Sequence, residues 1–151
     1  MDDISKPETD GWIGKYKSNT FQNYQQAEYD KATSFCKNKR TAIDLGGNIG
    51  MMAYRMCKDF NEVHSFEPLF SQHILRNTLQ FDNITVYPFA VGDKKEKVIM
   101  RKGIYHSGGS NIVKEKESNQ QTYVDDVEVV ILDDYNFKNV DFLKIDVEHY
   151  E

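Results

Sequence analysis

The sequence predicts an α/β fold with a mostly parallel sheet and flanking helices. Short apolar runs, typical of buried strands, alternate with segments whose apolar residues recur at helical spacing. Strand, helix, strand, helix and strand follow one another between residues 41 and 87, an order typical of parallel βαβ units. At 151 residues the chain is the size of one domain. We therefore expect a single domain, with a polar segment and helix over residues 1–40 packed on a core of residues 41–151.

The first elements follow from apolar spacing and from glycine. A loose apolar stripe from Phe21 to Phe35 predicts a helix, with Asn19 or Thr20 as its cap. The apolar run 41–45 stops at a pair of glycines, which predicts a short buried strand. Apolar residues then recur at helical spacing over residues 49–60 and predict an amphipathic helix.

The later elements are mostly strands. Residues 63–66 predict the second strand, and residues 69–79 predict a helix that Pro68 opens. Further strands are predicted over residues 84–87, 97–101, 127–132 and 140–147. A polar segment rich in Gly, Ser, Lys and Glu separates the second of these strands from the third.

Charge and hydropathy exclude several classes of function. The net charge of −5 argues against a protein dedicated to binding nucleic acid, and the basic cluster Lys37, Lys39 and Arg40 is interpreted as a solvated helix end. No stretch approaches the roughly 20 apolar residues that span a bilayer, so no membrane partner is expected. The polar N-terminus does not resemble a signal peptide. Cys36 and Cys57 are too few for a disulfide framework and lack metal-site spacing, which favours a reducing, cytoplasmic location and no bound metal.

The segment Asp44-Leu45-Gly46-Gly47-Asn48-Ile49-Gly50 lies between a predicted strand and a predicted helix. In open α/β sheets, ligands bind beyond the carboxyl ends of the strands. Glycine lets the backbone approach a ligand there because it has no Cβ atom. The alternative interpretation is a tight strand-to-helix turn without a ligand.

Acidic residues at three strand ends favour a ligand that carries positive charge. Asp44 precedes the glycines, where its carboxylate would repel a dinucleotide pyrophosphate and attract a sulfonium or amino group, and the glycine spacing departs from G-x-G-x-x-G. Glu67 ends the next strand about 20 residues later, where an acid accepts hydrogen bonds from ribose hydroxyls. Asp146 and Glu148 follow the last strand. Together these acids favour a nucleoside linked to an amino acid, and they count against a nicotinamide-dependent oxidoreductase.

Five blocks in this order resemble the FkbM-like methyltransferases. The blocks are residues 44–50, Ser65-Phe66-Glu67-Pro68, Asn77, Ala90-Val91-Gly92 and Lys144-Ile145-Asp146-Val147-Glu148. The resemblance runs from about Thr41 to the end of the chain. It implies a Rossmann-like methyltransferase fold, S-adenosylmethionine as cofactor, and O-methylation of a hydroxyl on a sugar or other small molecule.

The resemblance also implies roles for individual residues. Residues of the glycine turn would surround the methionine and ribose portions of the cofactor, namely Asp44, Gly46, Gly47, Asn48 and Gly50. Glu67, followed by Pro68, would hold the ribose hydroxyls, and Ala90 would lie beside the adenine. Asp146 would face the sulfonium and the reaction centre, whereas Asn77 is interpreted as a brace for the turn.

The chain departs from the family pattern at two places. His149 stands where the family usually has glycine, and it is either an acid/base group or a tolerated loop residue. The sequence ends at Glu151, so we expect a sheet truncated after its fourth core strand, with residues 142–147 as an exposed edge. An exposed edge strand favours pairing with a second copy of the chain or with a separate polypeptide that completes the sheet. The remaining interpretation is that the sequence is a fragment.

A hydroxyl nucleophile needs a base to remove its proton. The candidates are Asp146, Glu148, His149 and His106, of which we favour Asp146. The alternative function is a cofactor-binding or partner-dependent module without catalytic activity of its own.

Overall fold

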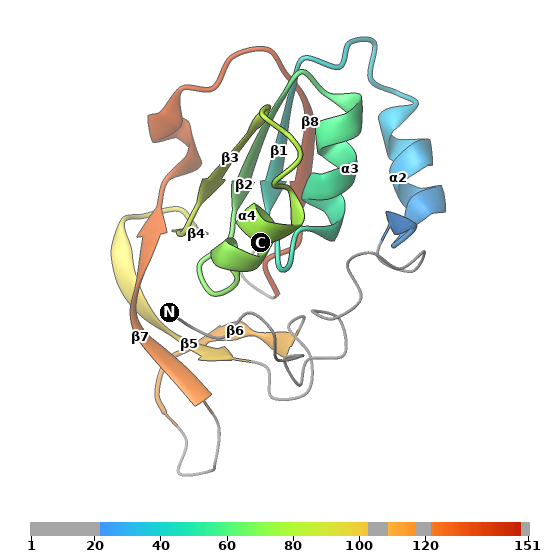
Figure 1. Cartoon of the computed structure of the whole chain (residues 1–151). Coiled ribbons are helices and arrows are strands. Elements are labelled where there is room, and N and C mark those ends of the chain that lie inside the picture. The colour runs from blue at the N-terminus through green and yellow to red at the C-terminus, as the bar shows by residue number, and fades with distance from the viewer. Residues whose placement is uncertain (1–21, 103–108, 117–121, 149–151) are drawn as a thin grey trace.

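The computed structural model describes residues 22–102, 109–116 and 122–148, and it contains two four-stranded sheets (Figure 1). The first sheet is parallel throughout and has the order β3-β2-β1-β8. Its strands are β1 (Thr41–Leu45), β2 (Glu62–Phe66), β3 (Ile84–Tyr87) and β8 (Val140–Ile145). The α/β fold class predicted from the sequence is confirmed by this sheet and by the helices that pack on it.

The second sheet lies beyond the carboxyl ends of the first and has the order β4-β7-β5-β6 (Figure 1). Its strands are β4 (Ala90–Val91), β5 (Glu96–Lys102), β6 (Asn111–Val113) and β7 (Thr122–Val130). β5 pairs antiparallel with both β6 and β7, whereas β4 runs parallel to β7. The sequence predicts a strand over residues 127–132, but β7 begins earlier and ends at Val130 because a 3₁₀ turn, η3 (Leu132–Tyr135), follows it.

Helices cover one face of the parallel sheet (Figure 1). They are α2 (Gln26–Thr33), α3 (Met51–Asp59) and α4 (Ser71–Asn77). The predicted apolar stripe of α3 is confirmed, since Met52, Met56 and Cys57 are buried against Ala42 and Val63 of the sheet. This packing fixes the start of α3 directly beneath the glycine turn.

Aromatic side chains cover the opposite face. Phe66 of β2 stacks on Tyr87 of β3, with ring centroids 4.4 Å apart. Tyr135 of η3 meets both rings edge-on, and Phe137 stacks on Tyr135. Residues that follow the second sheet therefore close this side of the first sheet without a long helix.

The predicted apolar face of the N-terminal helix is wrong in part. Phe35 lies beyond the end of α2 and is 78% exposed, while Tyr29 and Thr33 face the core instead. The Tyr29 hydroxyl donates a hydrogen bond to Asp59, and the Arg55 guanidinium lies over the Tyr29 ring. These polar contacts orient α2, and apolar spacing alone does not indicate them. The predicted caps Asn19 and Thr20 lie outside the described residues.

β8 forms one edge of the parallel sheet in the described part of the chain. Val140, Leu143 and Ile145 are 40%, 44% and 51% exposed. On the face opposite Leu143 and Ile145, Phe142 packs against Tyr29 and Phe60. Within the described residues, the strand is therefore packed on its helical face, and Leu143 and Ile145 on its other face are exposed.

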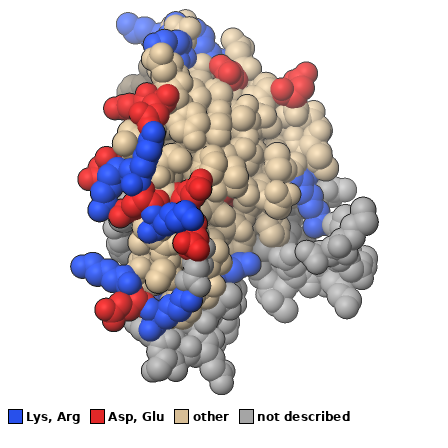
Figure 2. Space-filling model, turned by 90° about the vertical axis from the view of Figure 1, so that its left-hand side faces the viewer, with Lys and Arg blue, Asp and Glu red and all other residues tan. Residues whose placement is uncertain are grey.

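Charged side chains of both signs alternate over the second sheet (Figure 2). Lys95 pairs with Asp134, and Lys97 lies 3.8 Å from Asp126. The lysines on this face thus have acidic neighbours rather than forming a patch of one sign. Within the described residues, no helix is both long enough and apolar enough to cross a bilayer.

Candidate active site

A cavity of about 440 Å³ lies at the carboxyl ends of β1, β2 and β8. Its volume is in the range of small-molecule sites. Part of its wall comes from the second sheet, through Met100 of β5 and Ile112 of β6. The cavity therefore lies at the sheet edge where α/β folds bind their ligands, with the second sheet as a cover.

The glycine turn forms one wall, and its backbone passes unusually close to neighbouring groups. Gly46 has a φ of 76°, and a Cβ atom there would lie 2.0 Å from the carbonyl oxygen of Asp146. A Cβ atom at Gly47 would lie 2.3 Å from Ser65 Oγ. The N–H groups of both glycines donate to the carbonyl oxygen of Phe66. Only glycine at both positions permits this approach of the turn to β2 and β8.

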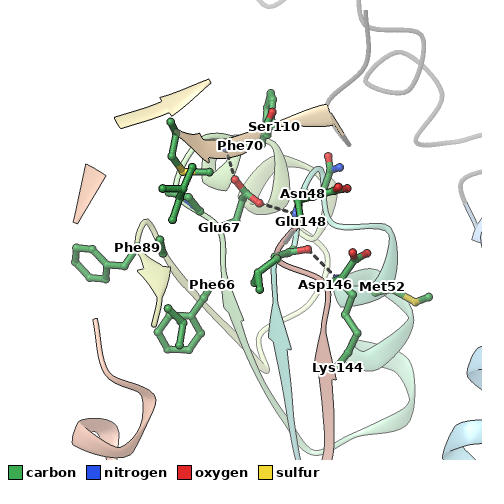
Figure 3. A pocket seen from close by; sticks show the side chains of 18 of the residues that line it. Asn48, Met52, Phe66, Glu67, Phe70, Phe89, Ser110, Lys144, Asp146 and Glu148 are labelled. Atoms are coloured by element: carbon green, nitrogen blue, oxygen red, sulfur yellow. Dashed lines mark hydrogen bonds and ion pairs between the residues drawn. The ribbon is translucent and has the colours of Figure 1, made fainter. Parts of the chain in front are cut away.

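Glu67 connects the glycine turn to the start of α4. Its side chain is buried, and it accepts hydrogen bonds from the backbone N–H groups of Asn48 (2.9 Å), Leu69 (2.8 Å) and Phe70 (3.1 Å). Figure 3 shows the carboxylate between Asn48 and Phe70. Burial raises the pKa of Glu67, the three backbone hydrogen bonds lower it, and Asp44 raises it, with a net increase. One acceptor position on Oε2 is left, because two donors meet Oε1 and one meets Oε2.

Asp44 and Lys144 form an ion pair at the base of the site. Asp44 is fully buried, and its Oδ1 lies 3.0 Å from Lys144 Nζ. Lys144 also donates a hydrogen bond of 2.8 Å to the carbonyl oxygen of Gly46. The ammonium group therefore joins β8 to the carboxyl end of β1.

Two further acids lie beyond β8. Asp146 is held by its backbone N–H, which donates to the carbonyl oxygen of Leu45, while its side chain is 55% exposed. Glu148 lines the cavity and has a φ of 50°. In Figure 3 these two acids lie with Asn48 on one side of the cavity, and Phe66 and Phe89 lie on the other. The cavity thus has an acidic side and an apolar side.

The family model for the methyltransferase FkbM domain matches residues 44–151. The chain belongs to the FkbM methyltransferase family. Methyl transfer is therefore the chemistry of this domain, and the predicted family is confirmed. Among curated proteins, none matches the chain.

The FkbM domain brings most of the predicted cofactor residues to one cavity. Those that line it are Gly46, Gly47, Asn48, Glu67, Pro68, Ala90 and Asp146. Asp44 and Gly50 do not line it among the described residues. Asp44 lies behind the turn on Lys144, and Gly50, with a φ of 92°, begins α3 against Ile74. His149 and His106 lie outside the described residues.

Other residues of the site were not predicted from the sequence. Lys144 belongs to the last of the five blocks, but no sequence signal indicates that its side chain points to β1. Met100 and Ile112 line the cavity from the second sheet, whose position no local pattern encodes. Asn77 was interpreted as a brace, and its side-chain amide donates a 2.7 Å hydrogen bond to the carbonyl oxygen of Ile49.

Proposed function

We propose that the domain binds S-adenosylmethionine in this cavity and methylates a hydroxyl group of a small molecule. The observation that carries the proposal is the division of the cavity into an acidic side and an apolar side. S-adenosylmethionine has a cationic sulfonium, a ribose with two hydroxyls and a flat apolar base, and each part has a complementary wall here.

Individual residues of the cavity match the separate parts of S-adenosylmethionine. Among the described residues, the side-chain oxygen of Asn48 is buried and has no hydrogen-bond partner, and Asn48 is part of the glycine turn. The remaining acceptor position of Glu67 suits a ribose hydroxyl. Phe89, Ala90 and Val91 offer an apolar surface for the base. Asp146 and Glu148 supply negative charge for the cationic end.

When bound, S-adenosylmethionine would supply an activated methyl group on a sulfonium. The protein then has to orient the acceptor hydroxyl, exclude water and remove one proton. Asp146 is the proposed base because its backbone is fixed to β1 while its carboxylate faces the cavity. His149 stays a second candidate from the sequence.

Calorimetric binding of S-adenosylmethionine and S-adenosylhomocysteine to the full chain tests the proposal. Ala90→Trp adds a large side chain to the cavity wall without removing a hydrogen-bonding group, so it should weaken binding of both ligands at least about tenfold. Ala32→Trp, on the exposed surface of α2, is the matched control and should bind like the wild type. Failure of the wild-type chain to bind either ligand would overturn the proposal.

Methylation of a hydroxyl, with Asp146 as the base, is tested by a second measurement. Formation of S-adenosylhomocysteine is followed with a panel of neutral sugars and phenolic or aliphatic alcohols. Asp146→Asn should lower turnover of any active substrate by about 10²–10⁴-fold, because the amide cannot accept the proton. Its affinity for S-adenosylhomocysteine should change little, whereas undiminished turnover would exclude Asp146 as the base.

A further inference from the structure

Lys144 lies where three parts of the cavity meet. Its ammonium nitrogen is 3.0 Å from Asp44 Oδ1, 2.8 Å from the carbonyl oxygen of Gly46 and 3.9 Å from Asp146 Oδ2. Its side chain is only 17% exposed, yet it lines the cavity. The lysine therefore contacts the strand before the glycine turn, the turn itself and the acid beyond β8.

The register of the sheet sets this arrangement. Lys144 of β8 is the direct neighbour of Asp44 of β1, and side chains of paired residues lie on the same face of a sheet. A carboxylate removed from water is costly unless an opposite charge compensates it. The Ser65 hydroxyl donates to Asp44 Oδ2 at 3.3 Å, but it is neutral. The compensating charge for Asp44 thus comes from Lys144.

The charge state of Lys144 follows from its surroundings. Burial lowers the pKa of the ammonium group, but Asp44 above all, with smaller contributions from Asp146 and Glu67, raises it above the usual value for lysine. Lys144 is therefore cationic at neutral pH. A cation in this place would oppose a cationic ligand unless Asp44 cancelled its charge.

We infer that Lys144 is a charge-balancing positioning residue: its ammonium group cancels the buried charge of Asp44 and holds the Gly46 carbonyl at the end of β1. The negative potential that a ligand meets then comes from Asp146 and Glu148. This inference rests on the proposed function, because the ligand charge at issue is that of a sulfonium. It also assigns Asp44 to Lys144, in place of the direct attraction to the ligand that the sequence suggested.

A consequence distinguishes this role from a purely structural one. Loss of the Asp44 charge leaves an uncompensated cation, and loss of the Lys144 charge leaves an uncompensated anion. S-adenosylmethionine carries a sulfonium charge and should respond to these changes with opposite signs. S-adenosylhomocysteine has a neutral sulfur at the same place and lacks this charge-dependent response. Loss of the contact between Lys144 and Gly46 affects both ligands alike and therefore cancels in the ratio of their affinities.

The experiment measures the ratio of the two dissociation constants by calorimetry. Relative to S-adenosylhomocysteine, Asp44→Asn should weaken S-adenosylmethionine on the order of tenfold, and Lys144→Met should strengthen it by a similar factor. The double variant D44N/K144M should return the ratio to within about twofold of the wild type. Equal changes for both ligands in every variant would overturn the inference and leave the proposed function intact. Absence of binding to the wild type would overturn both.

A second measurement uses the wild-type protein, since each single variant leaves a buried charge unpaired and can fail to fold. The Nζ resonance of Lys144 is observed in protein labelled with ¹⁵N-lysine and assigned by its absence from the double variant. It should shift when S-adenosylmethionine replaces S-adenosylhomocysteine, because the sulfonium changes the field at the ammonium group. Identical resonances in the two complexes would overturn the inference.

Discussion

The carboxylate of Glu67 accepts a hydrogen bond from the backbone N–H of Asn48, 2.9 Å away, although the two residues are 19 positions apart. The same carboxylate accepts from Leu69 and Phe70 on its other oxygen. A single buried side chain at the end of β2 therefore fixes both the glycine turn and the start of α4. Any ligand contact that it makes is additional to this internal role.

Glu67→Gln should destabilise the fold and weaken ligand binding together. An amide presents one oxygen in place of two, so at least one backbone N–H loses its acceptor inside the protein. A buried donor without an acceptor costs about 1–3 kcal/mol in the free energy of unfolding. Denaturant unfolding should show this loss, and calorimetry should show S-adenosylhomocysteine binding weakened at least about tenfold. Glu28→Gln, exposed on α2, is the control, and equal behaviour of the two variants would contradict the prediction.

Gly46→Ala should be more damaging than its size suggests. The added Cβ atom would lie 2.0 Å from the carbonyl oxygen of Asp146, and the residue has a positive φ. The free energy of unfolding should fall by more than about 1 kcal/mol, with weaker ligand binding because the turn must move. Gly92→Ala is the matched control: Gly92 is absent from the positive-φ glycines of the described chain, and its N–H bond to Val130 would be kept. Similar unfolding curves for the two variants would refute this account of the turn.

The pair between Arg40 and Asp141 should make stability depend on pH in the acid range. Hydrogen bonds from the Arg40 guanidinium, together with its backbone N–H, hold the pKa of Asp141 at about 2. A carboxyl whose pKa is lowered by folding contributes stability above its usual pKa and loses that contribution as the pH falls through the lowered value. The difference in the free energy of unfolding between wild type and Asp141→Asn should therefore be constant near neutral pH and vanish between about pH 4 and pH 2.

The control for this pH dependence adds Arg40→Met to both the wild type and Asp141→Asn and compares the two resulting proteins in the same way. Without the guanidinium, Asp141→Asn should change the free energy of unfolding less, and this change should depend less on pH. Chemical denaturation at several pH values measures both series. An undiminished effect of Asp141→Asn at pH 2 would show that the contribution is not electrostatic.

Cys57 should resist alkylation in the folded protein. Burial, with a smaller effect from Asp44, raises the pKa of this thiol to about 12, and its side chain packs beneath the sheet. The thiolate is the reactive form, so iodoacetamide at pH 8 should modify Cys57 at least about a thousandfold more slowly than in the unfolded chain. Peptide mass spectrometry before and after unfolding measures this rate. Rapid modification of folded protein at Cys57 would mean that α3 leaves the sheet readily.

Local patterns predicted the elements of the core well. β1 and β3 have the predicted bounds because β1 stops at the glycine pair and β3 lies between Asn83 and Pro88. The helix predicted over residues 69–79 is shorter, since the N–H groups of Leu69 and Phe70 donate to Glu67 before α4 begins. At its other end Leu79 is 78% exposed, so hydrophobicity alone does not extend the helix.

The site was predicted less completely than the fold. The glycine turn, Glu67 and Asp146 could be located because they directly follow predicted strands. The partner of Asp44, Lys144, could not be predicted. Their contact depends on the register between β1 and β8, which are far apart in the sequence. The same holds for the second sheet, whose strands were recognised individually while their position over the cavity was not.

The contact between Lys144 and Gly46 joins residues 98 positions apart. Pairings of such long sequence separation form slowly, because a long loop has to close before they contribute any stability. β1, β2 and β3 can assemble from neighbouring segments while the chain is still emerging from the ribosome, but the acidic side of the cavity exists only after residues 140–148 have docked. In a refolding experiment, recovery of ligand binding should therefore lag behind recovery of helix and sheet signals. The length of this lag would measure how long β8 takes to pair with β1.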